Sequence, residues 1–221
     1  MKNKLKLLPK DLLFKTNHLD HADWNYKPFL GFIQRKRFQL VLALLGNNNF
    51  DQILEIGYGS GIFMPILSKH CNKLYGIDIH PFNAKVNKIL LDYGIVTNLF
   101  QGSVSQMPFT NESFDLIVSV SAFEFVEDKK NTCLEILRVL RKDGIFIIVT
   151  PRESALLDLA LKILTKQEAK KDYGDTRQQI VPIIKEYFSI SHRKVFPSLI
   201  LSLFAHIYRP YVLTPRKQEN C

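Results

Sequence analysis

The stretch Leu54-Glu55-Ile56-Gly57-Tyr58-Gly59-Ser60-Gly61 decides the fold, because an apolar run passes directly into three glycines at alternate positions. Residues Gln52–Ile56 are typical of a buried strand and Ile62–His70 of a helix, so the glycines form the turn between them. Glycine allows a sharp bend and lets backbone N–H groups approach a ligand closely. The spacing is GxGxG, and Ile62 stands where a dinucleotide-binding fingerprint has its third glycine. By itself, the turn also fits a purely structural role.

Strand-like and helix-like patterns alternate on the carboxyl side of this turn. Near-continuous apolar strands separated by helices predict a parallel sheet that is covered on both faces. Lys142-Asp143-Gly144 is expected to be the turn before the last of these strands. The expected strands are 73–79, 97–101, 114–120 and 145–150, and the expected helices are 83–93 and 129–141.

The amino-terminal part of the chain is expected to cover this sheet. Residues 1–25 read as an irregular arm, and Lys27–Leu45 as a helix that ends at the glycine and asparagines of 46–49. We therefore divide the chain into an arm and helical cover, 1–46, and a main domain, 47–221. The apolar stripe expected on the covering helix consists of Phe29, Ile33, Phe38, Val41, Leu42 and Leu45.

The carboxyl-terminal part is less regular. Glu153–Lys171 reads as an amphipathic helix and Tyr187–Val195 as a strand, whereas Leu203–Val212 fits a strand or a helix equally well. The charge-free run Val195–Tyr208 is shorter than the roughly 20 residues needed to span a bilayer. It fits a buried strand, or a segment that lies on a membrane surface.

Composition is that of a globular protein, with 46% hydrophobic and 23% charged residues. The net charge of +9 resides on the flanks, since residues 1–46 carry nine Lys/Arg and three Asp, and 185–221 six Lys/Arg and two Glu. Basic flanks attract phosphates, anionic lipids or acidic sugars, or serve solubility alone. The chain has no RNP-type motif or Arg-rich block, which argues against a nucleic-acid partner.

Cysteine usage and the amino terminus indicate the compartment. Cys71, Cys133 and Cys221 have neither zinc-site nor disulfide-framework spacing, and the first ten residues lack the apolar stretch of a signal peptide. We expect a cytoplasmic protein, with peripheral contact at the inner membrane surface as an alternative for its basic, apolar carboxyl-terminal run.

Asp78 provides a second signal for ligand binding. It ends the strand that follows the glycine turn, about twenty residues further on, where an acidic side chain can accept hydrogen bonds from both ribose hydroxyls. The same carboxylate is also placed to cap a helix near Pro81. The glycine turn and Asp78 together favour an adenosine-containing cofactor.

Four segments, in this order, make the chain resemble the type-11 group of class I S-adenosylmethionine-dependent methyltransferases. The resemblance implies a Rossmann-like three-layer α/β sandwich, with a mostly parallel seven-stranded sheet whose last strand is antiparallel. It also implies that 47–221 is a methyltransferase domain, with S-adenosylmethionine as cofactor and a small-molecule, lipid-linked or saccharide acceptor. The segments are ILEIGYGSG, LYGIDIHP, QGSVSQMPFTNESFDLIVSVSAFEFVED and EILRVLRKDGIFIIVTP, all within residues 52–151.

The resemblance also implies which residues touch the cofactor. The glycine turn would surround its methionine part, Asp78 would hold the ribose, and residues after the second and third strands would flank the adenine. Ser119 and Ser121 follow the fourth strand, where cofactor and substrate meet in the family. The expected cofactor-binding residues are Glu55, Gly57, Tyr58, Gly59, Gly61, Asp78, Ile79, Ser103, Val104 and Ser119.

Two positions depart from the family pattern. Ser103 stands where the family usually has Asp, so its hydroxyl would bind the adenine amino group more weakly than a carboxylate does. Many relatives have a Glu-His pair where this chain has Glu124-Phe125. Glu124 is a candidate general base or substrate ligand, with a capped or salt-bridged surface glutamate as the alternative.

Other readings stay open beside this one. One alternative is a nicotinamide-dependent oxidoreductase, although its fingerprint includes the third glycine that this chain lacks. Another is a non-catalytic relative that binds cofactor, or nothing, and acts as the partner of another enzyme. His18-Leu19-Asp20-His21-Ala22-Asp23 packs potential metal ligands together, but no partner cluster exists elsewhere, so we expect no metal site. Residues 24–28 and 34–37 belong to an arm that closes over the cofactor pocket in related enzymes; here they contact an acceptor or cap the core.

Overall fold

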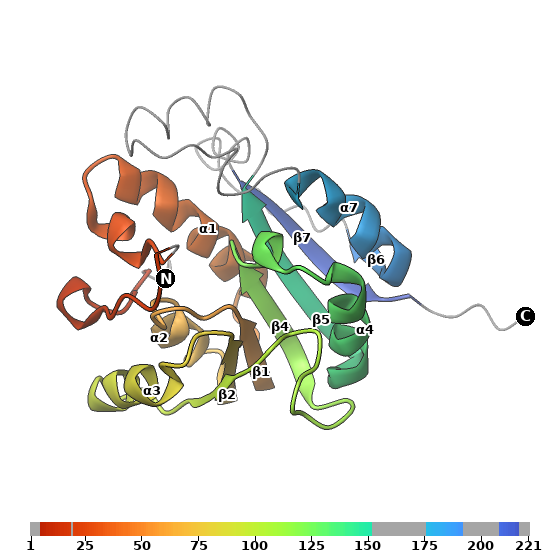
Figure 1. Ribbon diagram of the computed structural model, residues 1–221, viewed down its shortest axis with the longest axis horizontal. Helices are drawn as coiled ribbons and strands as arrows, with labels where there is room; N and C mark the ends of the chain where they lie inside the picture. Colours follow the sequence, from red (N-terminus) through yellow and green to blue (C-terminus); the bar gives the residue numbers. More distant parts are fainter. Residues whose placement is uncertain (1–4, 19, 152–175, 192–207, 217–221) are drawn as a thin grey trace, which may run out of the picture.

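One seven-stranded sheet organises the chain (Figure 1). The computed structural model describes residues 5–18, 20–151, 176–191 and 208–216. The strand order is β3-β2-β1-β4-β5-β7-β6. The strands are β1 Phe50–Ile56, β2 Cys71–Asp78, β3 Asn98–Gln101, β4 Phe114–Val120, β5 Leu140–Pro151, β6 Phe188–Ser191 and β7 Tyr208–Pro215.

The direction of the strands confirms the expected mixed sheet. Strands β1 to β5 are mutually parallel, and β7 runs antiparallel to both β5 and β6. From β1 the chain proceeds outward to β2 and β3, and then returns to β4 on the other side of β1. Ligands of open α/β sheets bind at such a reversal of strand order, outside the carboxyl ends of the strands.

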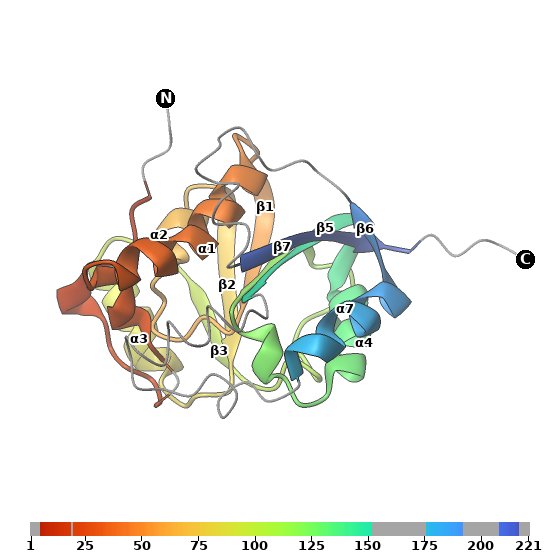
Figure 2. The same ribbon diagram turned by 90° about the horizontal axis from the view of Figure 1, so that it is seen from above.

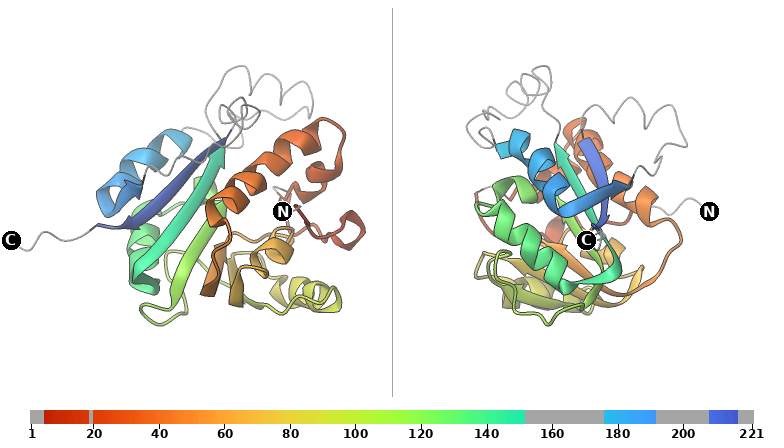
Figure 3. Two further views of the ribbon diagram at one scale, coloured as in Figure 1. Left: turned by 180° about the vertical axis from the view of Figure 1, so that it is seen from behind. Right: turned by 90° about the vertical axis from the view of Figure 1, so that its right-hand side faces the viewer.

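Helices cover both faces of the sheet, which confirms the three layers (Figures 2 and 3). Neighbouring residues of β1 point to opposite faces, so Ile53 joins the core under one helical layer and Leu54 the core under the other. The first layer contains α1 Leu30–Leu45, α2 Met64–Leu67 and α3 Asn83–Asp92; the second contains α4 Lys129–Val139 and α7 Thr176–Tyr187.

The covering helix α1 begins at Leu30, three residues later than expected. Leu30 N–H donates to the carbonyl of Pro28 at 2.5 Å, so Phe29 is the central residue of a γ-turn, with φ +53°. This turn directs Phe29 outward, where it is 85% exposed. The prediction that Phe29 belongs to the apolar stripe of the covering helix is therefore wrong. Phe38 does pack inward, stacked on Phe63 at 4.6 Å between ring centroids, so α1 shares a core with the sheet. The division of the chain at residue 46 stays a prediction.

Two elements next to the glycine turn and β4 differ from expectation. The helix predicted for 62–70 shortens to α2, a single turn with Pro65 near its start. The turn predicted at 142–144 lies inside β5, because Leu140 pairs with Phe114 and Ile145 with Leu116, across a register shift. Helix α4 accordingly ends at Val139, two residues early.

The carboxyl-terminal elements were predicted only in part. Helix α7 was missed, because Pro182 within it reads as a helix breaker. Strand β6 occupies the first part of the expected 187–195, and residues 208–212 are strand rather than helix. The expected helix 153–171 lies outside the described residues. Among the residues that are described, no helix is long and apolar enough to cross a bilayer.

Candidate functional site

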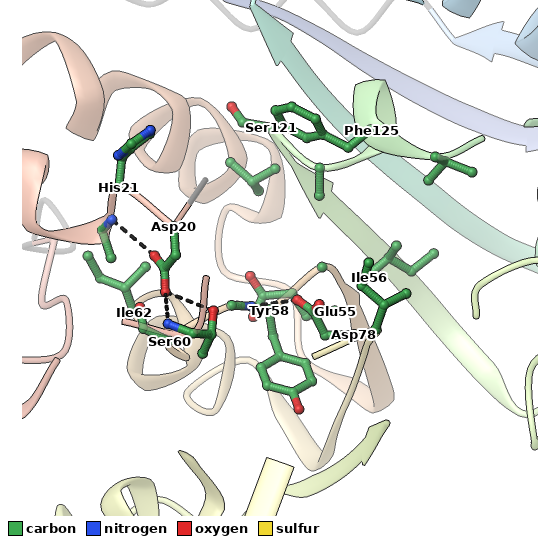
Figure 4. Close-up of a pocket in the computed structure, with 18 of the residues that line it drawn as sticks. Asp20, His21, Glu55, Ile56, Tyr58, Ser60, Ile62, Asp78, Ser121 and Phe125 are labelled. Atoms are coloured by element: carbon green, nitrogen blue, oxygen red, sulfur yellow. Dashed lines mark hydrogen bonds between the residues drawn. The ribbon is translucent and has the colours of Figure 1, made fainter. Parts of the chain in front are cut away.

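A cavity of about 510 Å³ opens at the carboxyl ends of β1, β2 and β4, where the strand order reverses. Its volume falls within the roughly 300–1,000 Å³ of small-molecule sites. The glycine turn and Asp78 form one side, and Ser121 and Phe125 lie across the cavity from Asp20 of the arm (Figure 4). The cavity is therefore where the sequence predicted a cofactor.

The turn after β1 needs its glycines for backbone conformation. Gly57, Gly59 and Gly61 have φ values of +72°, +51° and +71°, which residues with a Cβ rarely adopt. At Gly57 a Cβ would also lie 2.3 Å from the Cβ of Ala122. The turn consequently presents bare backbone to the cavity.

Asp78 is bound to that turn rather than to a helix. Its Oδ2 accepts the N–H of Gly59 at 2.9 Å, and its Oδ1 accepts the N–H of His80 at 3.4 Å. The imidazole of His80 adds a second link, with Nε2 3.0 Å from the carbonyl oxygen of Gly59. Helix α3 has Phe82 at its N-cap position and no side-chain cap, so the capping alternative for Asp78 is wrong.

Glu55 and Tyr58 place buried polar groups at the same wall. Glu55 is 4% exposed, and loss of solvation, together with the nearby charge of Asp78, holds its pKa well above the usual range of a carboxyl. Arg37 of α1 acts in the opposite direction. Burial also raises the pKa of Tyr58, whose ring packs edge-on against His80. Within the described chain, neither Glu55 Oε2 nor the Tyr58 hydroxyl has a hydrogen-bond partner.

The opposite end of the cavity is more open. Ile79, after β2, is 73% exposed and lines the cavity. Ser103 and Val104, after β3, line it as well. The hydroxyl of Ser103 lies 2.8 Å from that of Ser105 and accepts the Ser105 N–H at 3.3 Å, so the loop itself orients this hydroxyl.

Three of the residues singled out from the sequence lie outside the lining. Gly61 faces α3, where an added Cβ would stand 3.0 Å from Leu90 Cδ1. Ser119 is completely buried within β4. Glu124 is 1% exposed, so the surface glutamate is wrong. Burial raises the pKa of Tyr208, Arg37 opposes the rise, and the nearby charge of Glu124 adds to it.

The arm contributes wall residues that the sequence analysis did not assign to the cavity. Asp20 was weighed only as a metal ligand, yet its carboxylate accepts the N–H and hydroxyl of Thr16 and the N–H of Ala22. Its Oδ2 would lie 3.7 Å from a Cβ on Gly59, so the arm crosses the glycine turn. Leu8 N–H, donating to the Ile62 carbonyl at 3.0 Å, anchors this crossing. No sequence motif predicts this contact between the arm and the glycine turn.

Residues 24–28 and 34–37, which were expected to contact an acceptor or cap the core, form part of the cavity lining. Trp24, Gln34 and Arg37 line the cavity, while Lys27 and Pro28 are exposed. His21 also lines it and stacks on Trp24, with ring centroids 4.1 Å apart. In the parts of the chain that the structure describes, no group of three or more His, Cys, Asp or Glu side chains is placed to hold a metal ion.

Ser121, just after β4, is a strained residue at the cavity wall. Its φ is +54°, which is uncommon for a residue other than glycine, and its N–H donates to the carbonyl of Val149 at 2.8 Å. Its hydroxyl is buried without a hydrogen-bond partner among the described residues. Strain of this kind gathers at ligand sites.

The cavity wall is acidic. Arg37 is the one Lys or Arg among the described lining residues, which include five carboxylates. An acidic wall favours a cationic ligand and disfavours the pyrophosphate of a dinucleotide. The five carboxylates belong to Asp20, Glu55, Asp78, Glu127 and Asp128.

Comparison with known proteins agrees with this geometry. The sequence model of a methyltransferase domain matches residues 54–148. The chain is 26% identical over 132 residues to malonyl-[acyl-carrier protein] O-methyltransferase of Calditerrivibrio nitroreducens, covering 58% of this chain and 50% of that protein. It is 31% identical over 106 residues to phosphatidylethanolamine N-methyltransferase of Cereibacter sphaeroides, covering 47% and 52%. The chain thus spans about half the length of these curated relatives.

A solved structure shares the fold. N-methyltransferase NodS from Bradyrhizobium japonicum, in complex with S-adenosyl-L-homocysteine, superposes with a TM-score of 0.61 at 16% identity, covering 90% of this chain and 94% of that one. The matched residues 54–148 run from β1 through β5 and include the turn and Asp78. Residues 54–148 are therefore identified by sequence as a methyltransferase domain, and the fold is that of the solved methyltransferase structure.

Proposed function

We propose that this protein binds S-adenosylmethionine in the cavity above β1 and β4 and transfers its methyl group to an acceptor. The observation that carries the proposal is the hydrogen bond between Gly59 and Asp78, which places a bare glycine turn and a carboxylate side by side on one cavity wall. The acidic wall supports a cationic sulfonium ligand. A complex of the structurally similar NodS with S-adenosyl-L-homocysteine supports the same cofactor.

Each part of the cofactor has a proposed partner. Asp78, which lines the cavity, accepts hydrogen bonds from the ribose hydroxyls. Ile79 and Val104 hold the adenine, and the hydroxyl of Ser103 meets its amino group. Glu55, Gly57, Tyr58 and Gly59 surround the methionine part, while Gly61 and Ser119 act from behind the wall by shaping the turn and the end of β4.

Methyl transfer from the cofactor requires mainly that the protein position the methyl group and the acceptor. The bound sulfonium supplies an electrophilic methyl group. The arm residues and Phe125 enclose the cavity and exclude water from it, and the wall aligns a nucleophile behind the methyl; such positioning can contribute roughly 7–11 kcal/mol. A nucleophilic acceptor needs no strong base, so Glu124, which lies behind the lining, is not required as one.

We propose a small-molecule, lipid-linked or saccharide acceptor for this reaction. The relatives named for malonyl-acyl-carrier protein and phosphatidylethanolamine support acceptors of the first two kinds. A cytoplasmic protein with peripheral contact at the inner membrane surface would have access to both small-molecule and lipid-linked acceptors. Nucleic acid remains disfavoured, because the cavity wall is acidic.

A turnover assay tests the proposal against its rivals. With methyl-labelled S-adenosylmethionine and extracts separated into lipid, small-molecule and polymer fractions, label is expected in the lipid or small-molecule fraction, together with S-adenosylhomocysteine. Tight binding of NAD in place of S-adenosylmethionine would instead establish the oxidoreductase. Cofactor binding without any turnover would establish the non-catalytic relative.

A further inference from the structure

A strained turn at the start of α1 holds an aromatic ring in solvent. Its central residue, Phe29, has φ +53° and ψ −61°, which is the rare and strained form of the γ-turn. Phe29 is also the most exposed of the large hydrophobic side chains that the structure describes, so packing gives no return for this strain. Backbone strain of this kind persists mainly where function uses it.

The contact between the arm and α1 fixes the turn in this form. The N–H of Gly31 donates to the carbonyl of Lys27 at 2.8 Å. A Cβ on Gly31 would lie 2.4 Å from the carbonyl oxygen of Asn25, and the same oxygen accepts Nη1 of Arg35 at 2.8 Å. The outward direction of the Phe29 side chain is therefore built into the fold.

Four residues around this turn form an exposed apolar and basic surface, which we call the docking tip. Phe32 follows Phe29 by three residues and is itself 46% exposed, so two aromatic rings meet solvent within one helical turn. Pro28 and Lys27 are exposed beside them. Lys27 pairs with Asp23 at 3.8 Å, with both side chains about half exposed. The docking tip consists of Lys27, Pro28, Phe29 and Phe32.

Charge and size identify the partner that fits the docking tip. Residues 1–46 carry nine Lys/Arg and three Asp, and the arm lies next to the start of α1 (Figures 1 and 2). Aromatic rings flanked by basic residues suit insertion between the head groups of an anionic bilayer. Four residues are too few for a stable protein interface, which takes roughly 20–30 on each side. The exposed lysines of the described arm are Lys6, Lys10 and Lys15.

The docking tip adjoins the cavity. Trp24 precedes it and Ile33 follows it in the chain, and both line the cavity. We infer that Phe29 and Phe32 insert into an anionic membrane surface and bring the cavity to the lipid head groups. The docking is independent of methyl transfer. Its consequence, a lipid-linked rather than a soluble acceptor, rests on the proposed function.

Sedimentation with lipid vesicles, in the absence of cofactor, tests the docking. The wild type is expected to bind vesicles of phosphatidylglycerol and phosphatidylcholine, and to bind phosphatidylcholine alone far more weakly. Phe29→Gly should bind the mixed vesicles roughly tenfold more weakly, because burial of the ring is lost. Its melting temperature should stay the same or rise, since glycine adopts a positive φ without strain. Phe29→Leu, which keeps an apolar side chain, should retain most of the binding.

Leu91→Ser is the matched control, because Leu91 is an exposed apolar residue on α3, outside the docking tip. It should bind vesicles like the wild type. A wild type that binds neither kind of vesicle, or a Phe29→Gly variant that binds as tightly as the wild type, would overturn the inference. So would a wild-type dimer that Phe29→Gly dissociates without vesicles, since a second copy would then occupy the docking tip. Cofactor binding, measured separately, decides the proposed function whatever the vesicles show.

Discussion

The backbone N–H of Gly59 donates to Oδ2 of Asp78 at 2.9 Å, so the turn after β1 and the end of β2 form one unit. The parallel register produces this contact, because Glu55 pairs with Gly76 and Ile56 with Ile77, which brings both strand ends to the same level. Asp78 therefore has a structural partner as well as a proposed ligand, and substitutions must separate the two.

Asp78→Asn and Asp78→Ala make that separation. The amide oxygen of asparagine can still accept the Gly59 N–H, so Asp78→Asn should keep its melting temperature within a few degrees while binding S-adenosylhomocysteine about 10- to 100-fold more weakly. Asp78→Ala should lose both stability and binding. Calorimetry with thermal unfolding measures both; wild-type affinity in a folded Asp78→Asn protein would refute the ribose assignment.

Gly57→Ala tests whether the turn needs a bare backbone. Gly46 and Gly57 both have positive φ, but an added Cβ meets nothing within 4 Å at Gly46 and lies 2.3 Å from Ala122 Cβ at Gly57. Gly46→Ala should cost roughly 1 kcal/mol in the free energy of unfolding. Gly57→Ala should cost about 1–3 kcal/mol more and weaken cofactor binding, because Ala122 lines the cavity. Denaturant titrations that give equal losses would contradict this.

Ser103→Asp restores the residue that the family usually has. A carboxylate should bind the adenine amino group more strongly than the hydroxyl does, so S-adenosylhomocysteine affinity should rise up to about tenfold. Ser103→Ala, as control, should lower it slightly. The same order is expected with adenosine alone. Unchanged or weaker binding by Ser103→Asp would place the adenine elsewhere.

The strand-and-turn part of the site was predictable because its signals are local. Strand β4 and helix α3 lie where the apolar patterns put them, α3 to within one residue. Asp78 lies beside the glycine turn because carboxyl ends of neighbouring parallel strands meet at one edge of a sheet. Such features follow from periodicity and spacing over a few residues.

The remaining features depend on contacts between distant segments. Asp20 lies against Gly59, and Leu8 donates to Ile62, in two contacts between distant segments that no local pattern encodes. The same holds for Glu124, whose burial follows from packing, and for Phe29, which a γ-turn directs outward.

Glu135 gives a prediction about pH. The hydrogen bond from Arg138, and another from the backbone N–H of Met107, lower the pKa of this carboxyl. A lowered folded-state pKa means that the stabilisation is complete above the unfolded pKa of about 4.3 and disappears as pH falls through the folded value. Glu135→Gln should therefore lower the free energy of unfolding by about 1–3 kcal/mol at pH 7, and by progressively less below pH ~4.

The matched control for this prediction is Glu112→Gln. Glu112 pairs with Lys142 at 3.7 Å, with both side chains largely exposed, so its removal should have little effect at any pH. Urea titrations across pH 3–8 compare the two variants with the wild type. A Glu135→Gln deficit that is independent of pH would contradict the ionic origin of the stabilisation.

Calorimetric titration of S-adenosylmethionine into the wild-type protein tests the central claim most directly. We expect saturable one-to-one binding, with a dissociation constant in the range of about 1 µM to 1 mM that is usual for enzyme ligands. The titration is run at two temperatures, because the binding enthalpy can be close to zero at one of them. A protein that is folded by circular dichroism yet gives no binding heat at either temperature, at millimolar cofactor, would contradict the account.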